Sequence, residues 1–297
     1  MARNEVKKRI EIELDNMFTD LIRRIVPKHT VTPMKTPYFL ILTFLPFFLQ
    51  AQTQKATELK RFQVKEAKQG VAVDLQFFYV INNTSITKHS KQNGSLVQSW
   101  NDSTGLLKHL NSGLILENRL YCAHSNYPNK PMSSSIEIFD KNTLKHLASH
   151  SFGFFPGSAT WIDFYGGHWW VAFANYSDKN SDNGRDNRWT TLVKFTTQWQ
   201  QVAAWGFPEN LLQSFAPKST SGGTWGPDGN LYCTGHDKPE IYVLKIPERG
   251  STLIYIGTIA TPSEGQGFAI DRSQKNGINF WGITRNDNFV IQSSVKK

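Results

Sequence analysis

Short apolar segments separated by polar turns fill the chain from about residue 69 onward. In each segment apolar and aromatic residues run on or alternate over a few positions, a pattern typical of β-strands. Long runs of apolar residues at helical spacing are missing after residue 60. The pattern therefore predicts an all-β domain built from many short strands.

One pair of strands recurs five times along the chain. Each copy has a small residue, an apolar strand, a polar turn and a second strand that carries aromatic residues. The small residues are Gly70, Gly113, Ala159, Gly223 and Gly267, at intervals of 43, 46, 64 and 44 residues. A third strand follows every pair, and a fourth follows most of them. Four strands at this period are typical of a propeller blade, so the sequence predicts a five-bladed β-propeller.

Two features of the repeat bear on the number of blades and on closure of the ring. The 64-residue interval could contain a degenerate sixth blade, but most of its excess is the polar stretch at residues 176–189. We therefore expect five blades and keep six as the alternative. The last copy lacks a fourth strand, and the segment TELKRFQVK at residues 57–65 can supply it. Pairing of the first strand with the last would remove two bare sheet edges.

The two cysteines, Cys122 and Cys233, occur in matching LYC triplets of two second strands. Equivalent positions in blades two and four should lie farther apart than the roughly 7 Å between Cα atoms that a disulfide tolerates. We expect both cysteines to be small core residues.

Residues 34–51 have the order of parts of a secretory signal peptide. Lys35 is followed by an apolar stretch from Tyr38 to Leu49, and Ala51 is a suitable residue before a cleavage site. The alternative, a membrane anchor, is less well supported because a spanning helix needs about 20 apolar residues. We interpret residues 1–33 as an over-called start, that is, a stretch upstream of the true translation start at Met34, and as disordered or helical. We expect residues 52–297 to form a single exported propeller domain, periplasmic or secreted, and monomeric.

Charge gives no indication of a nucleic-acid partner. The whole chain carries a net charge of +9, from 33 Lys and Arg against 24 Asp and Glu. Eight of the basic and five of the acidic residues lie in residues 1–51, which leaves the remainder at +6. These charges are scattered, without a basic run interleaved with aromatic residues. We therefore expect no nucleic-acid partner.

One face of the predicted ring collects hydrogen-bonding side chains. The loop before each innermost strand and the loop between strands two and three lie on the same face of a propeller. From these loops, and from two innermost strands in the case of Trp161 and Trp225, we select as ligand-binding candidates Gln69, Asn111, Asn126, Asn175, Trp161, Trp225, Asp237, Gln266 and Arg285. Convergent donors and acceptors suit a small polar molecule, although surface loops are polar in any case. The two tryptophans could stack on a sugar or pack as wedges between blades.

Three residues on this face are candidates for acid–base chemistry. Glu264 is the one carboxylate directly before an innermost strand, and it could act as a general acid or base or pair with Arg285 or Lys68 at the rim. His124 and His236 could transfer protons, bind a metal or be satisfied loop residues. The spacings H-x-H and H-E-x-x-H are absent from the sequence, so we expect no metal at these histidines.

The stretch that begins at Asp178 is similar to the start of a calcium loop. Asp178, Asn180 and Asp182 alternate as calcium ligands do, but the sixth position lacks Gly and the twelfth is Trp189 in place of Glu. We expect no cofactor and keep calcium at these three residues as an alternative.

Two families resemble this sequence. The segment AKQGVAVDLQFFYV, with Gln69 and Gly70, resembles the first blade of the glutamine cyclotransferase (glutaminyl cyclase) propellers, which opens F-T-Q-G-L; Ala67 and Lys68 replace the Phe and Thr. The resemblance implies five blades and export. Over residues 109–271, HLNSGLI, LYCAHSNYP, SSIEIFD, GSATWID and EGQGFAID resemble exported bacterial propeller proteins often labelled cycloisomerase.

Three classes of function fit these observations. The first is an exported enzyme that acts on a small polar metabolite, through a cycloisomerase, cyclotransferase or lactonase type of reaction with Glu264 and His124 or His236 as proton carriers. The second is a non-catalytic module that binds a glycan or peptide on the polar face. The third is a scaffold that binds another envelope protein.

Overall fold

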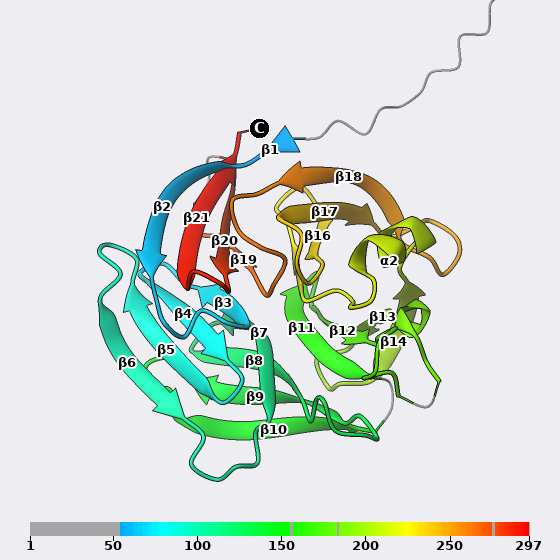
Figure 1. Ribbon diagram of the computed structural model, residues 1–297, viewed down its shortest axis with the longest axis horizontal. Coiled ribbons are helices and arrows are strands. Elements are labelled where there is room, and N and C mark those ends of the chain that lie inside the picture. Colours follow the sequence, from blue (N-terminus) through cyan, green and yellow to red (C-terminus); the bar gives the residue numbers. More distant parts are fainter. Residues whose placement is uncertain (1–53, 155–156, 183, 275–276, 297) are drawn as a thin grey trace, which may run out of the picture. The chain divides into compact units, whose positions relative to one another are not determined.

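Five β-sheets surround a central channel in the computed structural model of the chain (Figure 1). It describes residues 54–154, 157–182, 184–274 and 277–296. The arrangement is a five-bladed β-propeller, which confirms the predicted fold class and excludes the six-bladed alternative. The expected over-called start and signal peptide lie outside the described residues.

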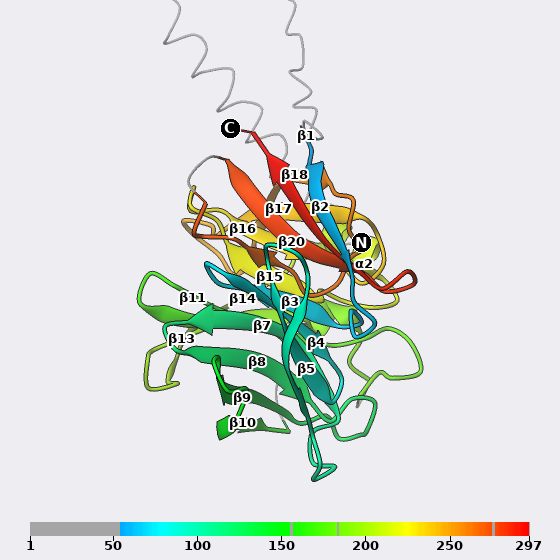
Figure 2. The same cartoon turned by 90° about the vertical axis from the view of Figure 1, so that its left-hand side faces the viewer.

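Each blade is an antiparallel sheet whose first strand lies innermost. Blade 1 contains β3 (Gly70–Val73), β4 (Phe77–Asn82), β5 (Ser85–Ser90) and β6 (Leu96–Asn101), and blade 2 contains β7 (His109–Leu116), β8 (Arg119–Ser125), β9 (Ser134–Asp140) and β10 (His146–Gly153). Blade 3 contains β11 (Ser158–Tyr165), β12 (His168–Ala174), β13 (Thr191–Phe195) and β14 (Gln201–Gly206). Figure 2 shows β7 to β10 lying side by side in this order.

Blades 4 and 5 are completed by strands from the beginning of the described chain. Blade 4 contains β15 (Gly222–Trp225), β16 (Leu231–Thr234), β17 (Glu240–Lys245) and β18 (Ile254–Ala260), beside which β1 (Gln54–Lys55) pairs in parallel. Blade 5 contains β19 (Ala269–Ile270), β20 (Ile278–Thr284), β21 (Phe289–Val295) and, outermost, β2 (Thr57–Gln63). Strand β2 pairs antiparallel with β21, which confirms the prediction that residues 57–65 supply the fourth strand of the last blade.

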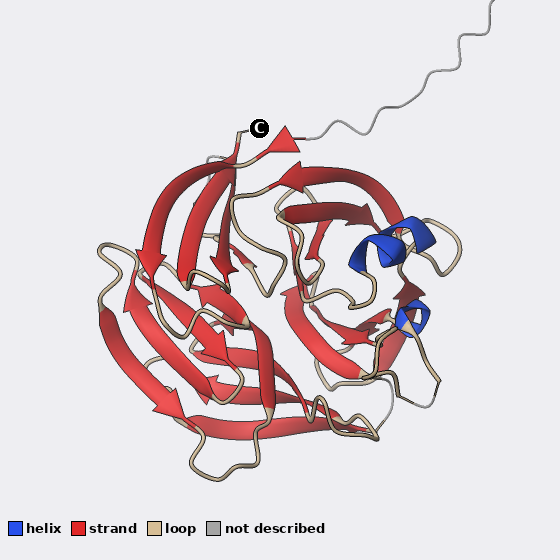
Figure 3. Cartoon of the chain, viewed as in Figure 1, coloured by secondary structure: helices blue, strands red, loops and turns tan. Residues whose placement is uncertain are grey.

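The 64-residue interval between Ala159 and Gly223 contains two helical elements. The 3₁₀ helix η1 (Asn187–Trp189) lies within the polar stretch, and α2 (Glu209–Phe215), which the sequence pattern did not indicate, follows β14. Figure 3 shows both on one side of the ring. Leu211, Leu212 and Phe215 of α2 are buried in the cluster between blades 3 and 4. The side chain of Asn187 donates a hydrogen bond to the carbonyl of Leu212 at 2.8 Å, which ties η1 to α2.

The small residues that mark the repeat lie where innermost strands approach closely. A Cβ atom on Gly70 would lie 3.1 Å from the Cα of Gly267 and 3.1 Å from the carbonyl oxygen of Asn111. The backbone N–H of Gly267 also donates to the carbonyl of Gln69 at 2.9 Å. Glycine at these positions therefore lets blades 1, 2 and 5 meet at the channel.

The core is divided into apolar clusters that lie between neighbouring blades. One joins Trp161 and Trp170 of blade 3 to Trp225 and Cys233 of blade 4. Another contains Cys122 of blade 2 together with side chains of blade 1. Both cysteines are buried and free, in agreement with their expected role as core residues.

Candidate functional site

A cavity of ≈ 440 Å³ opens at one mouth of the channel, within the size range of small-molecule sites. All five blades contribute side chains from the loops before their innermost strands, from those strands, or from the loops between their second and third strands. Five of the candidates selected from the sequence line it, namely Gln69, Asn111, His236, Gln266 and Arg285. Their roles in binding or catalysis stay predictions.

Amide and imidazole groups of blades 1 and 2 form a hydrogen-bonded wall of this cavity. Oδ1 of Asn83 accepts a hydrogen bond from Nε2 of Gln69 at 2.8 Å and lies 2.8 Å from Nδ1 of His109. Because this oxygen can only accept, the proton of His109 is on Nδ1. Nε2 of His109 then accepts from Nδ2 of Asn111 at 3.3 Å. The imidazole is thus neutral and fixed in one tautomer.

Burial, and to a smaller extent electrostatic interaction with His124, Arg285 and His236, lower the pKa of His109 to about 4. Because the folded pKa lies below the unfolded value near 6.5, His109 stabilises the fold fully above pH 6.5 and progressively less as the pH falls toward 4. The variant His109→Gln should not show this loss of stability at acid pH. We expect the loss of free energy of unfolding between neutral and acid pH to be smaller in the variant by up to about 3 kcal/mol. Urea unfolding at several pH values measures it, and identical pH slopes for the two proteins would contradict the assignment.

Two buried polar atoms in the cavity wall have no hydrogen-bond partner among the described residues. They are Oδ1 of Asn111 and Oγ1 of Thr160. Asn111 is 4% exposed and Thr160 is 2% exposed. A buried polar atom without a partner raises the free energy of the folded protein, so such atoms call for an explanation. A ligand with donor and acceptor groups would satisfy both.

His236 links blade 4 to blade 5 across the cavity. Nε2 of His236 lies 3.1 Å from Nη1 of Arg285. Since a guanidinium only donates, Nε2 accepts and the proton of His236 is on Nδ1, which donates to Oδ1 of Asp237 at 2.5 Å. Burial is the main cause that lowers the pKa of His236. The result is a neutral imidazole oriented by a carboxylate, as in many general bases.

Glu264 is not among the residues that line the cavity. Its Oε2 accepts the backbone N–H of Arg285 at 2.7 Å, and its Oε1 lies 3.5 Å from Nδ2 of Asn286. Lys68 donates to the carbonyl of Arg285 at 2.7 Å, so both backbone groups of Arg285 are held. The geometry thus gives Glu264 a positioning role toward the loop of Arg285, and its predicted role as acid or base stays untested.

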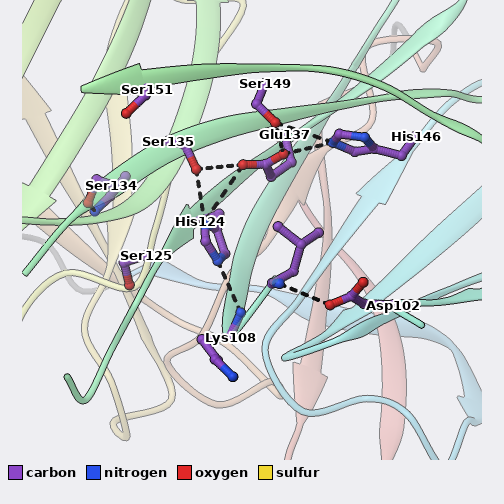
Figure 4. Close-up of polar contacts among 12 residues, drawn as sticks. Asp102, Lys108, His124, Ser125, Ser134, Ser135, Glu137, His146, Ser149 and Ser151 are labelled. Carbon is purple, nitrogen blue, oxygen red and sulfur yellow. Dashed lines mark hydrogen bonds and ion pairs between the residues drawn. The ribbon is translucent and has the colours of Figure 1, made fainter. Parts of the chain in front are cut away.

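His124 does not line the cavity either; it is buried and belongs to a hydrogen-bonded network within blade 2 (Figure 4). Its Nε2 accepts the backbone N–H of Lys108 at 3.1 Å, so its proton is on Nδ1, which donates to Ser135. Ser135 in turn donates to the buried carboxylate of Glu137, which also contacts His146 at 2.7 Å. Burial lowers the pKa of His124, while Glu137 and Asp102 oppose this shift. His124 therefore anchors the segment that leads into the cavity wall.

The remaining binding candidates lie away from the cavity lining. Trp161 is fully buried and donates to Oγ1 of Thr220 at 3.1 Å, and Trp225 stacks on Tyr165, so both are interblade core residues. Asn126 bridges its own loop through Ser133 and Pro131. Asn175 donates to the carbonyl of Trp189 at 3.2 Å. Neither tryptophan is placed to stack on a ligand at this mouth.

Each of the three residues that resemble calcium ligands, Asp178, Asn180 and Asp182, contacts a different protein group. Asp178 pairs with Lys218 at 2.7 Å, and Asp182 accepts the backbone N–H of Met132 at 2.7 Å. The side chain of Asn180 donates to the hydroxyl of Tyr127 at 2.7 Å. Within the described ranges, no group of three or more His, Cys, Asp or Glu side chains is placed to hold a metal ion.

Several cavity residues were not among the candidates selected from the sequence. Lys108 precedes β7, His109 begins it, Thr160 lies in β11, and Lys218 precedes β15. Lysine before an innermost strand is a recurring signal, because Lys108 and Lys218 hold the same place before the small residues Gly113 and Gly223. Lys218 escaped notice because the long interval before blade 4 interrupts the repeat.

The opposite mouth has a smaller cavity of ≈ 260 Å³ with a different chemistry. One of its buried carboxylates, Asp163, accepts hydrogen bonds from the backbone of Trp225 at 2.7 Å and from the guanidinium of Arg272 at 2.6 Å. This charge is already paired, in contrast to the unpartnered atoms of the first mouth.

Solved structures are similar to this chain in fold, whereas no family model and no curated protein matches its sequence. A glutaminyl cyclase from Myxococcus xanthus aligns with a TM-score of 0.54 and 10% identity, over 82% of this chain and 97% of that chain. The shared feature is the β-propeller. A luciferin-regenerating enzyme aligns with a TM-score of 0.46 and 8% identity, over 80% of this chain and 95% of that chain. The PQQ-bound aldose sugar dehydrogenase of Streptomyces coelicolor aligns with a TM-score of 0.48 and 11% identity, over 79% of this chain and 80% of that chain.

In the described part of the chain, none of the helices has the length and apolar character needed to cross a membrane.

Proposed function

We propose that the chain binds a small polar molecule in the mouth cavity. One observation carries this proposal: every blade contributes to the lining of the cavity, and two lining residues, Asn111 and Thr160, each have a buried polar atom without a hydrogen-bond partner among the described residues. A bound molecule with hydroxyl or amide groups would supply the missing partners. A thermal-shift screen with sugars, lactones, hydroxy acids, amino-acid derivatives and metal ions identifies such a molecule.

Substitution of Thr160 by Val separates binding from folding. Because Oγ1 of Thr160 lacks a protein partner, its replacement by a methyl group should leave the free energy of unfolding unchanged or raise it slightly. Loss of the ligand's hydrogen bond should weaken binding about 2- to 10-fold. Calorimetric titration of the screened ligand measures the affinity, and Thr143→Val in an exposed turn serves as the control. An unchanged affinity in Thr160→Val would contradict the proposal.

A second candidate function is a proton-transfer reaction on the bound molecule, of the cycloisomerase, cyclotransferase or lactonase type. The arrangement of Asp237, His236 and Arg285 favours it, because a neutral, oriented imidazole lies at the cavity. NMR of the ligand incubated with the protein distinguishes the candidates. Conversion that Asp237→Asn slows more than tenfold would indicate catalysis, whereas an unchanged ligand would indicate a binding module.

Export of the protein is part of the same proposal. The apolar stretch that ends at Leu49, followed by Ala51, supports cleavage before Gln52. N-terminal sequencing of the protein recovered from an exporting bacterial host tests this, and a mature chain that retains residues 34–51 would argue against it.

A further inference from the structure

The lining of the mouth cavity is cationic. Lys108, Lys218 and Arg285 contribute to it, and no Asp or Glu lies among the lining residues that the structure describes. Three carboxylates outside the lining are already engaged, Asp178 by Lys218, Asp237 by His236, and Glu264 by the backbone of Arg285. Positive charge that faces a cavity without a lining carboxylate attracts an anion.

Arg285 has the most hydrogen-bond donors of these cations. Its guanidinium contacts Nε2 of His236 and forms no ion pair with a carboxylate within the described ranges. An arginine has five N–H donors in a planar fork that matches the two oxygens of a carboxylate. One contact to His236 leaves most of these donors for a ligand, and Lys108, exposed at the rim, adds a second charge without an ion pair in the described chain.

Other groups of the cavity call for hydroxyls and for an apolar surface. Oδ1 of Asn111 needs a donor, and Oγ1 of Thr160 can donate or accept. The rings of Tyr127 and Tyr176, 5.3 Å apart between centroids, form a second wall. Aromatic rings of this kind pack against C–H groups. A simple inorganic anion would satisfy the cations but neither of these features.

We propose that the ligand of the mouth cavity is a small hydroxylated carboxylate, of the size of a sugar acid, whose carboxylate is bound by Arg285. This inference rests on the proposed function, because it names the chemical class of the molecule bound at the same site. The hydroxyl groups of the ligand pair with Asn111 and Thr160, and Lys108 and Lys218 add positive charge around the carboxylate.

Matched pairs of ligands test the class directly. The full chain is titrated calorimetrically at low ionic strength with glucuronate and glucose, galacturonate and galactose, glycerate and glyceramide, which differ within each pair by one negative charge. We expect the acid to bind at least tenfold more tightly than its neutral counterpart in at least one pair, and the preference to shrink as salt is added. Arg285→Gln should weaken binding of that acid about 10- to 100-fold.

Two control variants keep the result independent of folding. Arg119→Gln removes an exposed arginine at the opposite end of blade 2 and should leave the affinity unchanged. Arg285→Lys keeps the charge without the planar fork and should restore only part of the binding. A neutral member that binds as tightly as its acid in every pair would overturn the inference and leave the proposed function intact. Failure of every pair, with a thermal-shift screen that yields no ligand at all, would overturn both.

Discussion

Deletion of residues 54–63, which form β1 and β2, is expected to unfold the propeller. Strand β2 forms six residue pairs with β21 and closes blade 5. Its residues are largely exposed, so most of its contribution comes from backbone hydrogen bonds, each worth about 1 kcal/mol net. Phe62 adds stacking on Phe78 of blade 1 and Trp281 of blade 5, at 5.3 and 6.1 Å between centroids. A loss of about 5 kcal/mol is comparable to the whole stability of a typical domain.

Circular dichroism and urea unfolding measure this loss, and complementation identifies its cause. A synthetic peptide of residues 54–65 added to the truncated chain should restore the folded signal, whereas a scrambled peptide should not. Leu59→Ala, which changes a half-exposed side chain of β2, should alter the free energy of unfolding by less than about 0.5 kcal/mol. A truncated chain that unfolds at the same urea concentration as the intact protein would contradict closure by this strand.

Trp161→Ala is expected to lower the free energy of unfolding by about 3–5 kcal/mol. Trp161 is fully buried between blades 3 and 4, so its loss leaves a large cavity in the core. A matched change at an exposed tryptophan, Trp189→Ala, should have a much smaller effect, because that side chain is 57% exposed. Urea unfolding of the two variants makes the comparison, and equal losses would show that Trp161 is not a wedge between the blades.

Gly223 provides the second half of this test. A Cβ atom on Gly223 would lie 2.2 Å from the indole of Trp161, so Gly223→Ala should destabilise the intact protein by about 1–3 kcal/mol. In the Trp161→Ala background the same change should cost close to nothing, because the indole that it would overlap is gone. Additive effects in this double-mutant cycle would contradict the packing of the two blades through these residues.

Much of the fold is predictable from the sequence because the repeat imposes it. The position of Gly70 recurs at Gly113, Ala159, Gly223 and Gly267, and the missing fourth strand of the last copy predicts the pairing of β2 with β21. Helix α2 was missed because its seven residues are too few for a helical period to stand out. It lies in the one interval where the repeat breaks.

The face of the candidate site is predictable, but the side-chain contacts on it are not. Position within the repeat directs Gln69, Asn111 and Arg285 to the same mouth. It does not show whether a side chain lines the cavity, which Glu264 and His124 do not, because that depends on how loops of different blades pack. Trp161 and Trp225 pack between blades and do not line the cavity. An innermost strand presents some residues to the channel and others to the next blade, and the sequence pattern does not distinguish the two.

The geometry around His236 connects binding with the second candidate function. Arg285 covers the lone pair of the one imidazole that Asp237 orients at the cavity. A carboxylate bound by Arg285 would therefore lie next to this imidazole. The chemistry of proton transfer and the recognition of an anion would then depend on the same loop, which Glu264 and Lys68 hold through its backbone.

The most direct measurement for the central claim is a crystal structure of the chain with the tightest ligand from the screen. The account predicts electron density in the cavity between blades 1 to 5, with ligand atoms within hydrogen-bond distance of Oδ1 of Asn111 and Oγ1 of Thr160. Density at the opposite mouth beside Asp163 and Arg272, or an empty cavity at a saturating concentration of ligand, would contradict it.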